Sequence, residues 1–371
     1  MVPAISQDNV TLRVESGAIL VLRLYDVAFA IDLPRVEVLA AAPVSRLRLR
    51  RAEPKAISFG TAPVELSLGE IVLPGSQPRG EAIARLYEFG AVAISLRVPV
   101  QDLGWEDYVD LVNATYRWAA SATGAQFFAD TLARVQRQIA PALTRPSPEH
   151  IEEDYLLSIV HRFNREVNAD EFGDDIDLVP LLSGERQLAA SERAELLRHR
   201  FSYYPNDLVV LTWDRAFVIE PSGDMDVADV LEVANAQLLE LRYYDELLDA
   251  ELPVMYGRVE SARQRLRGLG RRRYAALARQ LHTLVAEVTE ITERIDNALK
   301  VTEDVYLARI YGAALELFRT GTWGAAVDHK LAIIRDTYSA LYDDAATARA
   351  ELLELTIVLL IVFEVILAFV I

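Results

Sequence analysis

The sequence predicts an α+β protein: a mixed α/β domain with a largely antiparallel sheet, then a long α-helical hairpin and a C-terminal transmembrane helix. Short β-rich runs separated by Pro and Gly fill residues 11–100, whereas helical periodicity with almost no Pro or Gly follows residue 223. The chain has 371 residues, 52% hydrophobic and 25% charged. This composition can build a core and excludes both a disordered chain and a multi-span membrane protein.

Composition also limits the chemistry and the partners. There are no cysteines, which excludes disulfides, thiolate zinc sites and thiol nucleophiles. The 55 acidic and 38 basic residues give a formal net charge of −17, so nucleic acid and anionic bilayers should repel the chain as a whole. Nucleic acid is therefore a disfavoured partner, and either partner would need a local basic patch.

Five strands are expected before the first helix, because period-two or β-rich runs alternate there with Pro and Gly. These runs are residues 19–24, 27–33, 44–49, 64–72 and 91–98. Apolar residues at helical spacing then predict helices over 105–118 and 126–139, and the apolar run 155–160 is a further strand candidate.

A polar, acidic stretch covers residues 168–177, and a short helix is expected around 192–200. The runs 208–213 and 216–219, separated by Asp-Arg, predict a hairpin that closes the domain. We place the domain boundary at residue 222, where Pro-Ser-Gly precedes the helical region.

Residues 223–354 are expected to be helical, starting with a helix over 226–252. Two later segments, 277–295 and 327–355, carry apolar residues at alternating spacings of four and three, which is a coiled-coil seam. Two long helices with such seams most simply form an antiparallel hairpin, and we expect homo-oligomers through these helices. In the alternative, each seam packs on a compact bundle.

Residues 355–371 predict a transmembrane helix that anchors the chain. Seventeen residues of helix are about 25 Å long. The fourteen Leu, Ile, Val and Phe residues contribute about −4 to −8 kcal/mol to insertion, against about +3 for one acid. The anchor residues are Leu355, Leu359, Val362, Glu364 and Ile366. The acid lies off the seam of the other four and would face lipid or a second helix. The alternative is a buried central helix in an oligomer.

Three segments together resemble the required-for-meiotic-nuclear-division/YagE family, the domain-of-unknown-function 155 family. They are RLYEFGAVAISLRVPV (85–100), LEVANAQLLELRYYDELLD (231–249) and LELTIVLLIVFEVILAFVI (353–371). Eukaryotic members carry an aromatic-Trp-Asp motif where this chain has Val305, Tyr306 and Leu307. The resemblance implies a bacterial member with an α/β domain, a helical region and a membrane helix, and its relatives include a mitochondrial protein associated with translation. It implies no catalytic residues.

A basic run breaks the acidic composition, with a single acid, Glu260, beside it. Its residues are Arg263, Arg265, Arg267, Arg271, Arg272 and Arg273. Three readings stay open: a solvated helix face, a site for anionic lipid headgroups, and a site for RNA, which is the weakest because no aromatic residues are interleaved. If the hairpin forms, the run returns to the membrane surface beside residue 354.

No catalytic, cofactor-binding or metal-binding residues are predicted. The acids around Gly173 lack the spacing of a calcium loop, and the histidines lack paired metal spacing. We therefore expect a non-enzymatic, single-pass membrane protein whose bulk is cytoplasmic and which acts as a membrane-proximal scaffold or adaptor. The alternatives are a translation- or RNA-associated factor and an enzyme with an unrecognised site in the N-terminal domain.

Overall fold

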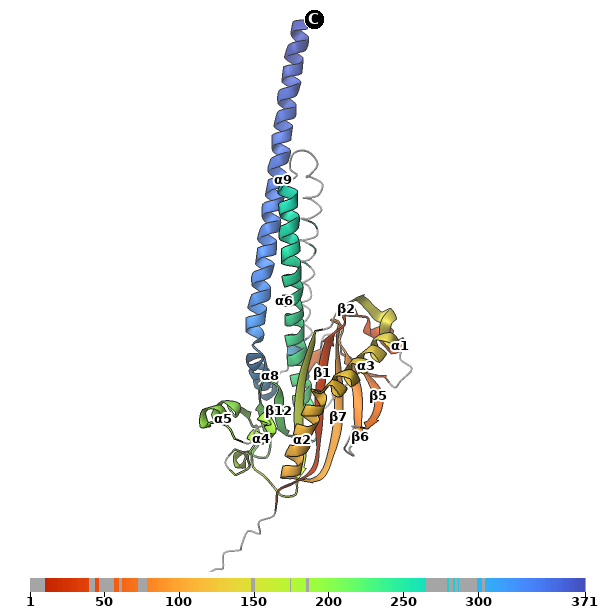
Figure 1. Cartoon of the computed structure of the whole chain (residues 1–371), viewed down its shortest axis with the longest axis vertical. Coiled ribbons are helices and arrows are strands. Elements are labelled where there is room, and N and C mark those ends of the chain that lie inside the picture. Colours follow the sequence, from red (N-terminus) through yellow and green to blue (C-terminus); the bar gives the residue numbers. More distant parts are fainter. Residues whose placement is uncertain are drawn as a thin grey trace, which may run out of the picture. The chain divides into compact units, whose positions relative to one another are not determined.

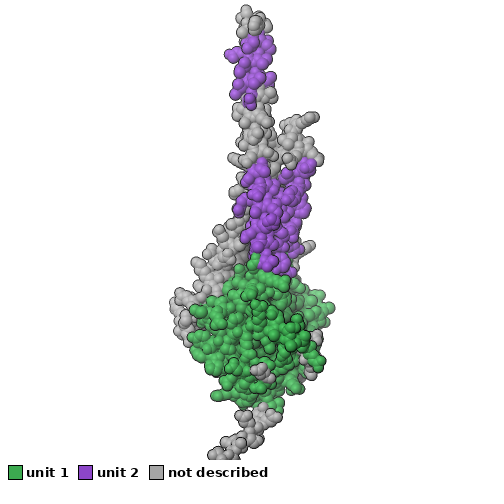
Figure 2. All heavy atoms as spheres, turned by 90° about the vertical axis from the view of Figure 1, so that its left-hand side faces the viewer, with its two compact units in different colours: residues 1–240, 294–321 green, residues 241–293, 322–371 purple. Residues whose placement is uncertain are grey.

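The computed structural model describes most of the chain. The described residues are 11–39, 44–46, 57–59, 62–72, 79–147, 151–173, 175–184, 187–264, 279, 283, 286, 299–301 and 304–370. The chain divides into two compact units (Figure 2): unit 1, residues 1–240 with 294–321, and unit 2, residues 241–293 with 322–371. Unit 1 thus extends past residue 222, the boundary expected from the sequence.

Unit 1 is built on a sheet that has nine strands among the described residues (Figure 1), in the order β10-β11-β12-β9-β1-β7-β6-β5-β3. Two small sheets pair β2 with β8 and β4 with β13. The strands are β1 (Arg13–Asp26), β2 (Ala28–Ile31), β3 (Val44–Arg46), β4 (Ile57–Phe59), β5 (Val64–Val72), β6 (Arg79–Leu86), β7 (Ala91–Gly104), β8 (Leu143–Pro146), β9 (Glu152–Phe163), β10 (His199–Phe201), β11 (Leu208–Leu211), β12 (Arg215–Ile219) and β13 (Leu299–Val301).

The predicted mixed domain with a mostly antiparallel sheet is confirmed. Strand β1 lies in the middle and pairs antiparallel with β7 and with β9. The expected hairpin is β11–β12, in which Leu208 lies opposite Ile219. Strand β12 then runs parallel to β9, which is the one parallel pair among the described strands of this sheet.

Helices α2 (Trp105–Ala119) and α3 (Ala122–Ile139) lie along one face of the sheet (Figure 1) and confirm the predicted pair. The Ser121 hydroxyl accepts a hydrogen bond from the Gly124 amide and caps α3. The side chains buried on this face come from strands and helices alike, among them Val21, Ile94, Leu156, Phe217, Tyr108, Val112, Phe128 and Val135.

The opposite face of the sheet is covered too, because successive strand residues point to opposite sides. Leu20, Leu22 and Leu24 alternate along β1 with the residues of the first core and are also buried. Residues 226–240 of α6 (Asp226–Gln264) and α8 (Val305–Leu317) supply the second set of helical residues in unit 1. Those buried side chains are Val230, Leu231, Ala234, Leu238, Leu307, Ile310 and Ala314.

Some local predictions differ from the structure. The run expected as a strand over 27–33 is shorter, because α1 (Leu33–Leu39) begins there. Strand β6 was not predicted, since its Arg and Glu residues weaken the β-rich pattern. The short helix α5 (Ala190–Leu196) ends earlier than the expected residue 200, because β10 begins at His199. Shorter elements are α4 (Val179–Ser183) and the 3₁₀ turns η1 (Ala140–Ala142) and η2 (Ala169–Glu171).

Unit 2 contains the second part of α6 and most of α9 (Thr320–Val370). Lys330 on α9 pairs with Asp245 at 2.6 Å and with Asp249 at 2.7 Å, while the Arg242 guanidinium lies 5.9 Å from the Trp323 ring centroid. Partners further along α6 contact residues further along α9, so the two helices run parallel. Their buried residues are Tyr244, Leu248, Met255, Val327, Leu331 and Ile334.

The predicted antiparallel hairpin involves the seam at 277–295, nearly all of which lies outside the described residues. The start of the second seam is buried as expected, in unit 2. The sequence also predicts a transmembrane helix over 355–371. Over the part of the chain that the structure describes, no helix is long and apolar enough to cross a membrane.

Candidate functional site

A buried charge cluster joins the sheet of unit 1 to the first turns of α6. Arg85 on β6 donates from Nη1 to Asp229 Oδ1 and to Glu232 Oε2, at 2.9 Å each. Its Nη2 lies 3.5 Å from Glu65 Oε2 on β5. The Tyr87 hydroxyl donates to Glu232 Oε1 at 2.5 Å. We call these five residues the Arg85 cluster.

Local sequence explains how the cluster is assembled. Glu65 and Arg85 are directly opposite each other in the β5–β6 ladder, so their side chains share a face. Asp229 and Glu232 are three residues apart on α6 and therefore project from the same side of the helix. After Tyr87 the chain turns back into β7 through Gly90, whose φ of +107° favours glycine.

Burial and the charges of neighbouring side chains together set the pKa values in the cluster. The Arg85, Asp229 and Glu232 side chains are 14%, 13% and 5% exposed. Burial raises the pKa of Asp229 and of Glu232, and Arg85 only partly opposes this shift. Burial acts to lower the pKa of Arg85, but the surrounding carboxylates outweigh it and hold that pKa well above its usual value. Burial and the Glu232 carboxylate raise the pKa of Tyr87.

The cluster holds one cation against three carboxyl groups. Each of its buried members binds another member, so its chemistry is that of a structural contact that fixes α6 on the sheet. Nearby, burial and the Asp229 and Asp224 carboxylates raise the pKa of Asp226 to about 6. The sequence pattern did not reveal these residues as a site, because the helix acids lie 144 and 147 residues after Arg85.

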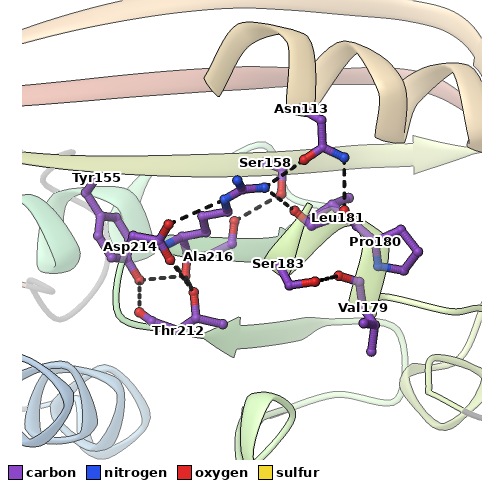
Figure 3. A network of polar contacts seen from close by, with 11 residues as sticks. Asn113, Tyr155, Ser158, Val179, Pro180, Leu181, Ser183, Thr212, Asp214 and Ala216 are labelled. Carbon is purple, nitrogen blue, oxygen red and sulfur yellow. Dashed lines mark hydrogen bonds and ion pairs between the residues drawn. The ribbon is translucent and has the colours of Figure 1, made fainter. Parts of the chain in front are cut away.

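A second buried arginine joins the hairpin of unit 1 to two helices (Figure 3). Arg215 Nη1 donates to Asn113 Oδ1 on α2 at 2.7 Å and to the Leu181 carbonyl at 3.0 Å. Its Nε lies 3.6 Å from Asp214 Oδ2, and its guanidinium stacks 3.8 Å from the Tyr116 ring centroid. Neutral oxygens and an aromatic face therefore stabilise most of this charge, which indicates a structural role.

An open recess of about 510 Å³ lies next to β10, the last strand at one edge of the sheet. It is lined by Asn168, Ala169, Asp170, Glu171, Asp175, Ser202, Tyr204 and Pro205. Two contacts join its walls: the Ala169 amide donates to the Pro205 carbonyl at 2.7 Å, and the Arg200 guanidinium donates to the Ala169 and Phe172 carbonyls. The recess is thus built from segments that are fixed to each other.

The structure places the residues predicted from the sequence as follows. Leu359, Val362, Glu364 and Ile366 lie on α9 and are exposed, while the side chain of Leu355 is not among those described. In the basic run, Arg263 lies in α6 without a described side chain, and the residues from Arg265 to Arg273 lie outside the described residues. None of the predicted site residues whose side chains the structure describes belongs to the Arg85 cluster or lines the recess.

The acids around Gly173 that the structure describes are separated rather than gathered into a cation loop. Glu171 pairs with Arg165 at 2.7 Å, and Asp177 pairs with Arg193 at 3.0 Å. The Asp177 carboxylate also accepts a hydrogen bond from the Val179 amide at the start of α4. Within the described residues, no three His, Asp or Glu side chains are grouped so that they could hold a metal ion.

A comparison with known protein families identifies a family for the N-terminal part of the chain. A family model described as the N-terminal domain of uncharacterized protein MJ0711 matches residues 16–226, which is more than half of the chain. The chain belongs to this family. The match extends from β1 to the start of α6, so it includes Arg85, Arg215 and the recess.

A comparison with curated proteins also finds a relative. Uncharacterized protein MJ0711 from Methanocaldococcus jannaschii is 28% identical over 175 residues, which are 47% of this chain and 52% of the relative. The chain thus aligns with about half the length of the curated relative that it matches. No solved structure matches the chain.

Proposed function

We propose that this protein is a membrane-anchored scaffold or adaptor, held at a bilayer through residues 355–371. A single observation carries the proposal: large apolar side chains stand exposed along the far part of α9. They are 48–63% exposed. These residues are Ile357, Val358, Leu359, Leu360, Ile361, Val362, Phe363, Val365 and Ile366.

The pattern of exposure favours a lipid environment. The exposed residues are nearly consecutive and point in every direction around the helix, whereas a helix that packs on one partner has a single apolar stripe. Leaving such side chains in water is unfavourable by about 25 cal/mol per Å² of apolar surface. A bilayer covers all sides of the helix at once, and the apolar sequence continues to Ile371.

Glu364 is the one charge in this segment and works against insertion by about 3 kcal/mol. The apolar residues outweigh it, so insertion stays favourable, and we expect the carboxyl group to be paired inside an oligomer. We further propose that the arginines at 263–273 bind anionic lipid headgroups, each contributing about 1 kcal/mol near such a surface. This would keep the bulk of the chain on the cytoplasmic side.

The resemblance to the required-for-meiotic-nuclear-division/YagE family stays a proposal. Two of the three motifs that suggested it contact each other in this chain. Arg85 and Tyr87 belong to the first motif, and both bind Glu232 of the second.

Membrane extraction tests the anchor. Membranes from cells that express the full chain are washed with alkaline carbonate, and pellet and supernatant are compared by immunoblot. We expect the full chain in the pellet and a chain ending at Ala350 in the supernatant. The double variant Leu359→Arg, Val362→Arg should also be released, because two central arginines add about 6 kcal/mol to the insertion free energy.

The matched control adds the same two charges to exposed positions earlier on α9, as Ala332→Arg and Ser339→Arg. It should stay in the pellet. Release of the unchanged full chain would refute the membrane anchor. In that case the size of the released protein, measured by analytical ultracentrifugation, distinguishes a helix buried between copies from an exposed one.

A further inference from the structure

We infer that the recess beside β10 binds an arginine side chain from a basic, extended segment of a partner protein. The inference names a partner chemistry for unit 1 and does not depend on the membrane anchor. It rests on exposed aromatic rings, unpaired carboxylates and the shape of the recess, all within unit 1.

Exposed aromatic residues mark this surface. Tyr203 and Tyr204 are 66% and 62% exposed, and their ring centroids are 4.8 Å apart in an edge-to-face arrangement. Tyr203 also lies 5.6 Å from the ring of Tyr306 at the start of α8. Tyrosine is enriched in protein interfaces because it offers a large rigid surface with one polar end. A cluster of such rings in water is therefore a surface suited to a protein partner.

The charge of the recess selects a cation. Asp170 and Asp175 line it, both are exposed, and neither makes an ion pair with another described residue. Glu171 is already neutralised by Arg165 at 2.7 Å. Among the described residues, these two carboxylates therefore have no cation as an ion-pair partner. RNA and anionic lipid carry phosphates, which these carboxylates would repel.

The combination of an aromatic ring with carboxylates favours arginine over lysine. A guanidinium stacks on a tyrosine face and donates two parallel hydrogen bonds to a carboxylate, whereas an ammonium is a compact, strongly hydrated charge. Tyr204 provides the ring and the two aspartates provide the acceptors. The volume of about 510 Å³ lies in the range of ligand pockets and exceeds what one arginine side chain needs.

The surface is held in place before a partner arrives. The Tyr203 amide donates to Asp207 Oδ1 at 2.7 Å, which fixes the loop that carries both exposed tyrosines. On the other wall, the Asn168 side chain and the Glu171 carboxylate form a capping box at η2. A recess held in this way loses little conformational entropy when it binds, which favours affinity.

Fluorescence anisotropy of the purified full chain in detergent tests the inference. The probes are fluorescein-labelled peptides of alternating Gly and Arg, Gly and Lys, or Gly and Glu, together with labelled oligouridine. We expect the Arg peptide to bind about tenfold more tightly than the Lys peptide, with weakening as salt rises. The Glu peptide and oligouridine should not bind.

Two variants remove the proposed contacts. Tyr204→Ala and the double variant Asp170→Asn, Asp175→Asn should each weaken binding of the Arg peptide by about tenfold or more. The control Glu70→Gln, Asp130→Asn makes the same change in net charge on β5 and α3 and should alter binding less than twofold. Thermal unfolding confirms that every variant is folded.

Equal weakening by the control and by the double aspartate variant would show that overall charge alone attracts the peptide, which overturns the inference. Equal affinity for Arg and Lys peptides would overturn the role of the tyrosine face. Binding of oligouridine at least as tight as that of the Arg peptide would assign the surface to nucleic acid instead.

Discussion

Replacing Arg85 with Met tests the Arg85 cluster directly. The variant Arg85→Met keeps much of the apolar part of the side chain but removes the charge that binds Asp229 and Glu232, at 2.9 Å each. Both carboxyl groups then stay buried without their cation. We expect a large loss of stability in unit 1, because an unpaired buried charge is among the most destabilising changes in a protein core.

The size of this stability loss follows from the two protonation states that Glu232 can adopt in the variant. It can stay ionised in the interior, or it can take up a proton. At pH 7, protonating a carboxyl group with an ordinary pKa of 4.5 costs about 3.4 kcal/mol, at about 1.36 kcal/mol per pH unit. Asp229 faces the same choice. We therefore expect a loss of about 3 to 5 kcal/mol, the range measured when one partner of a buried pair is removed.

The pH dependence has a definite sign. Burial raises the pKa of both carboxyl groups in the folded protein, so the folded form binds protons more tightly than the unfolded form. Stability linked to such groups falls as pH rises from their ordinary pKa toward the raised one. Without Arg85, which opposes them, the upward pKa shifts of Asp229 and Glu232 become larger. The loss caused by Arg85→Met should therefore shrink by about 2 to 3 kcal/mol between pH 7.5 and pH 5.5.

The assay is urea unfolding of the full chain in detergent, followed by tryptophan fluorescence, because Trp105, Trp118 and Trp213 all belong to unit 1. The control is Arg79→Met on the same strand, whose partner Glu70 and own side chain are 70% and 75% exposed. That change should cost less than about 1 kcal/mol. Equal losses for the two variants, or a loss for Arg85→Met that does not shrink at low pH, would refute the reasoning.

Three further predictions concern other parts of the chain. Burial raises the pKa of Asp26 to about 7, so the folded form holds a proton that the unfolded form loses, and stability falls between about pH 4 and pH 7. Asp26→Asn should remove this fall in urea unfolding, and an unchanged pH profile would contradict the prediction. Gly90→Ala places a Cβ 1.7 Å from the Ala28 carbonyl oxygen at a positive φ, so it should destabilise unit 1 by more than about 3 kcal/mol. Gly69 also has a positive φ but open space around it, so Gly69→Ala should lower the stability by only about 1 to 2 kcal/mol. Lys330→Met leaves Asp245, which is 16% exposed, without its ammonium partner, so unit 2 should lose about 1 to 3 kcal/mol of stability. Unfolding followed by circular dichroism measures this loss, and no loss would mean that the pair does not stabilise the parallel helices.

Local patterns in the sequence were sufficient for several elements. Helices α2 and α3 repeat apolar residues at helical spacing, and the hairpin β11–β12 follows from two apolar runs around Asp214-Arg215. In each case the residues that decide the structure are neighbours along the chain. The apolar character of the end of α9 was also evident from the sequence, because no polar face alternates with its apolar residues.

The tertiary structure alone decided how distant segments pair. The parallel contact of β12 with β9 places Arg215 beside Leu156, and no periodicity within either strand specifies that neighbour. The same holds for α6 and α9, whose parallel contact through Lys330 no pattern within either helix specifies. Strand order depends on the combined burial of many side chains, which a single run of sequence does not contain.

The candidate sites show most clearly the difference between what local sequence indicates and what the tertiary structure decides. In the sequence, Arg85 and Glu232 are ordinary charged residues, 147 positions apart. Folding brings them to 2.9 Å and removes them from water. Burial then raises the pKa of Glu232, while the surrounding carboxylates raise the pKa of Arg85 against the effect of burial. In the recess, Asp170 and Tyr204 come together because two loops are hydrogen-bonded to each other. The sequence thus determined the kinds of element and the apolar end of α9, while the charged sites exist only through contacts between segments far apart in the chain.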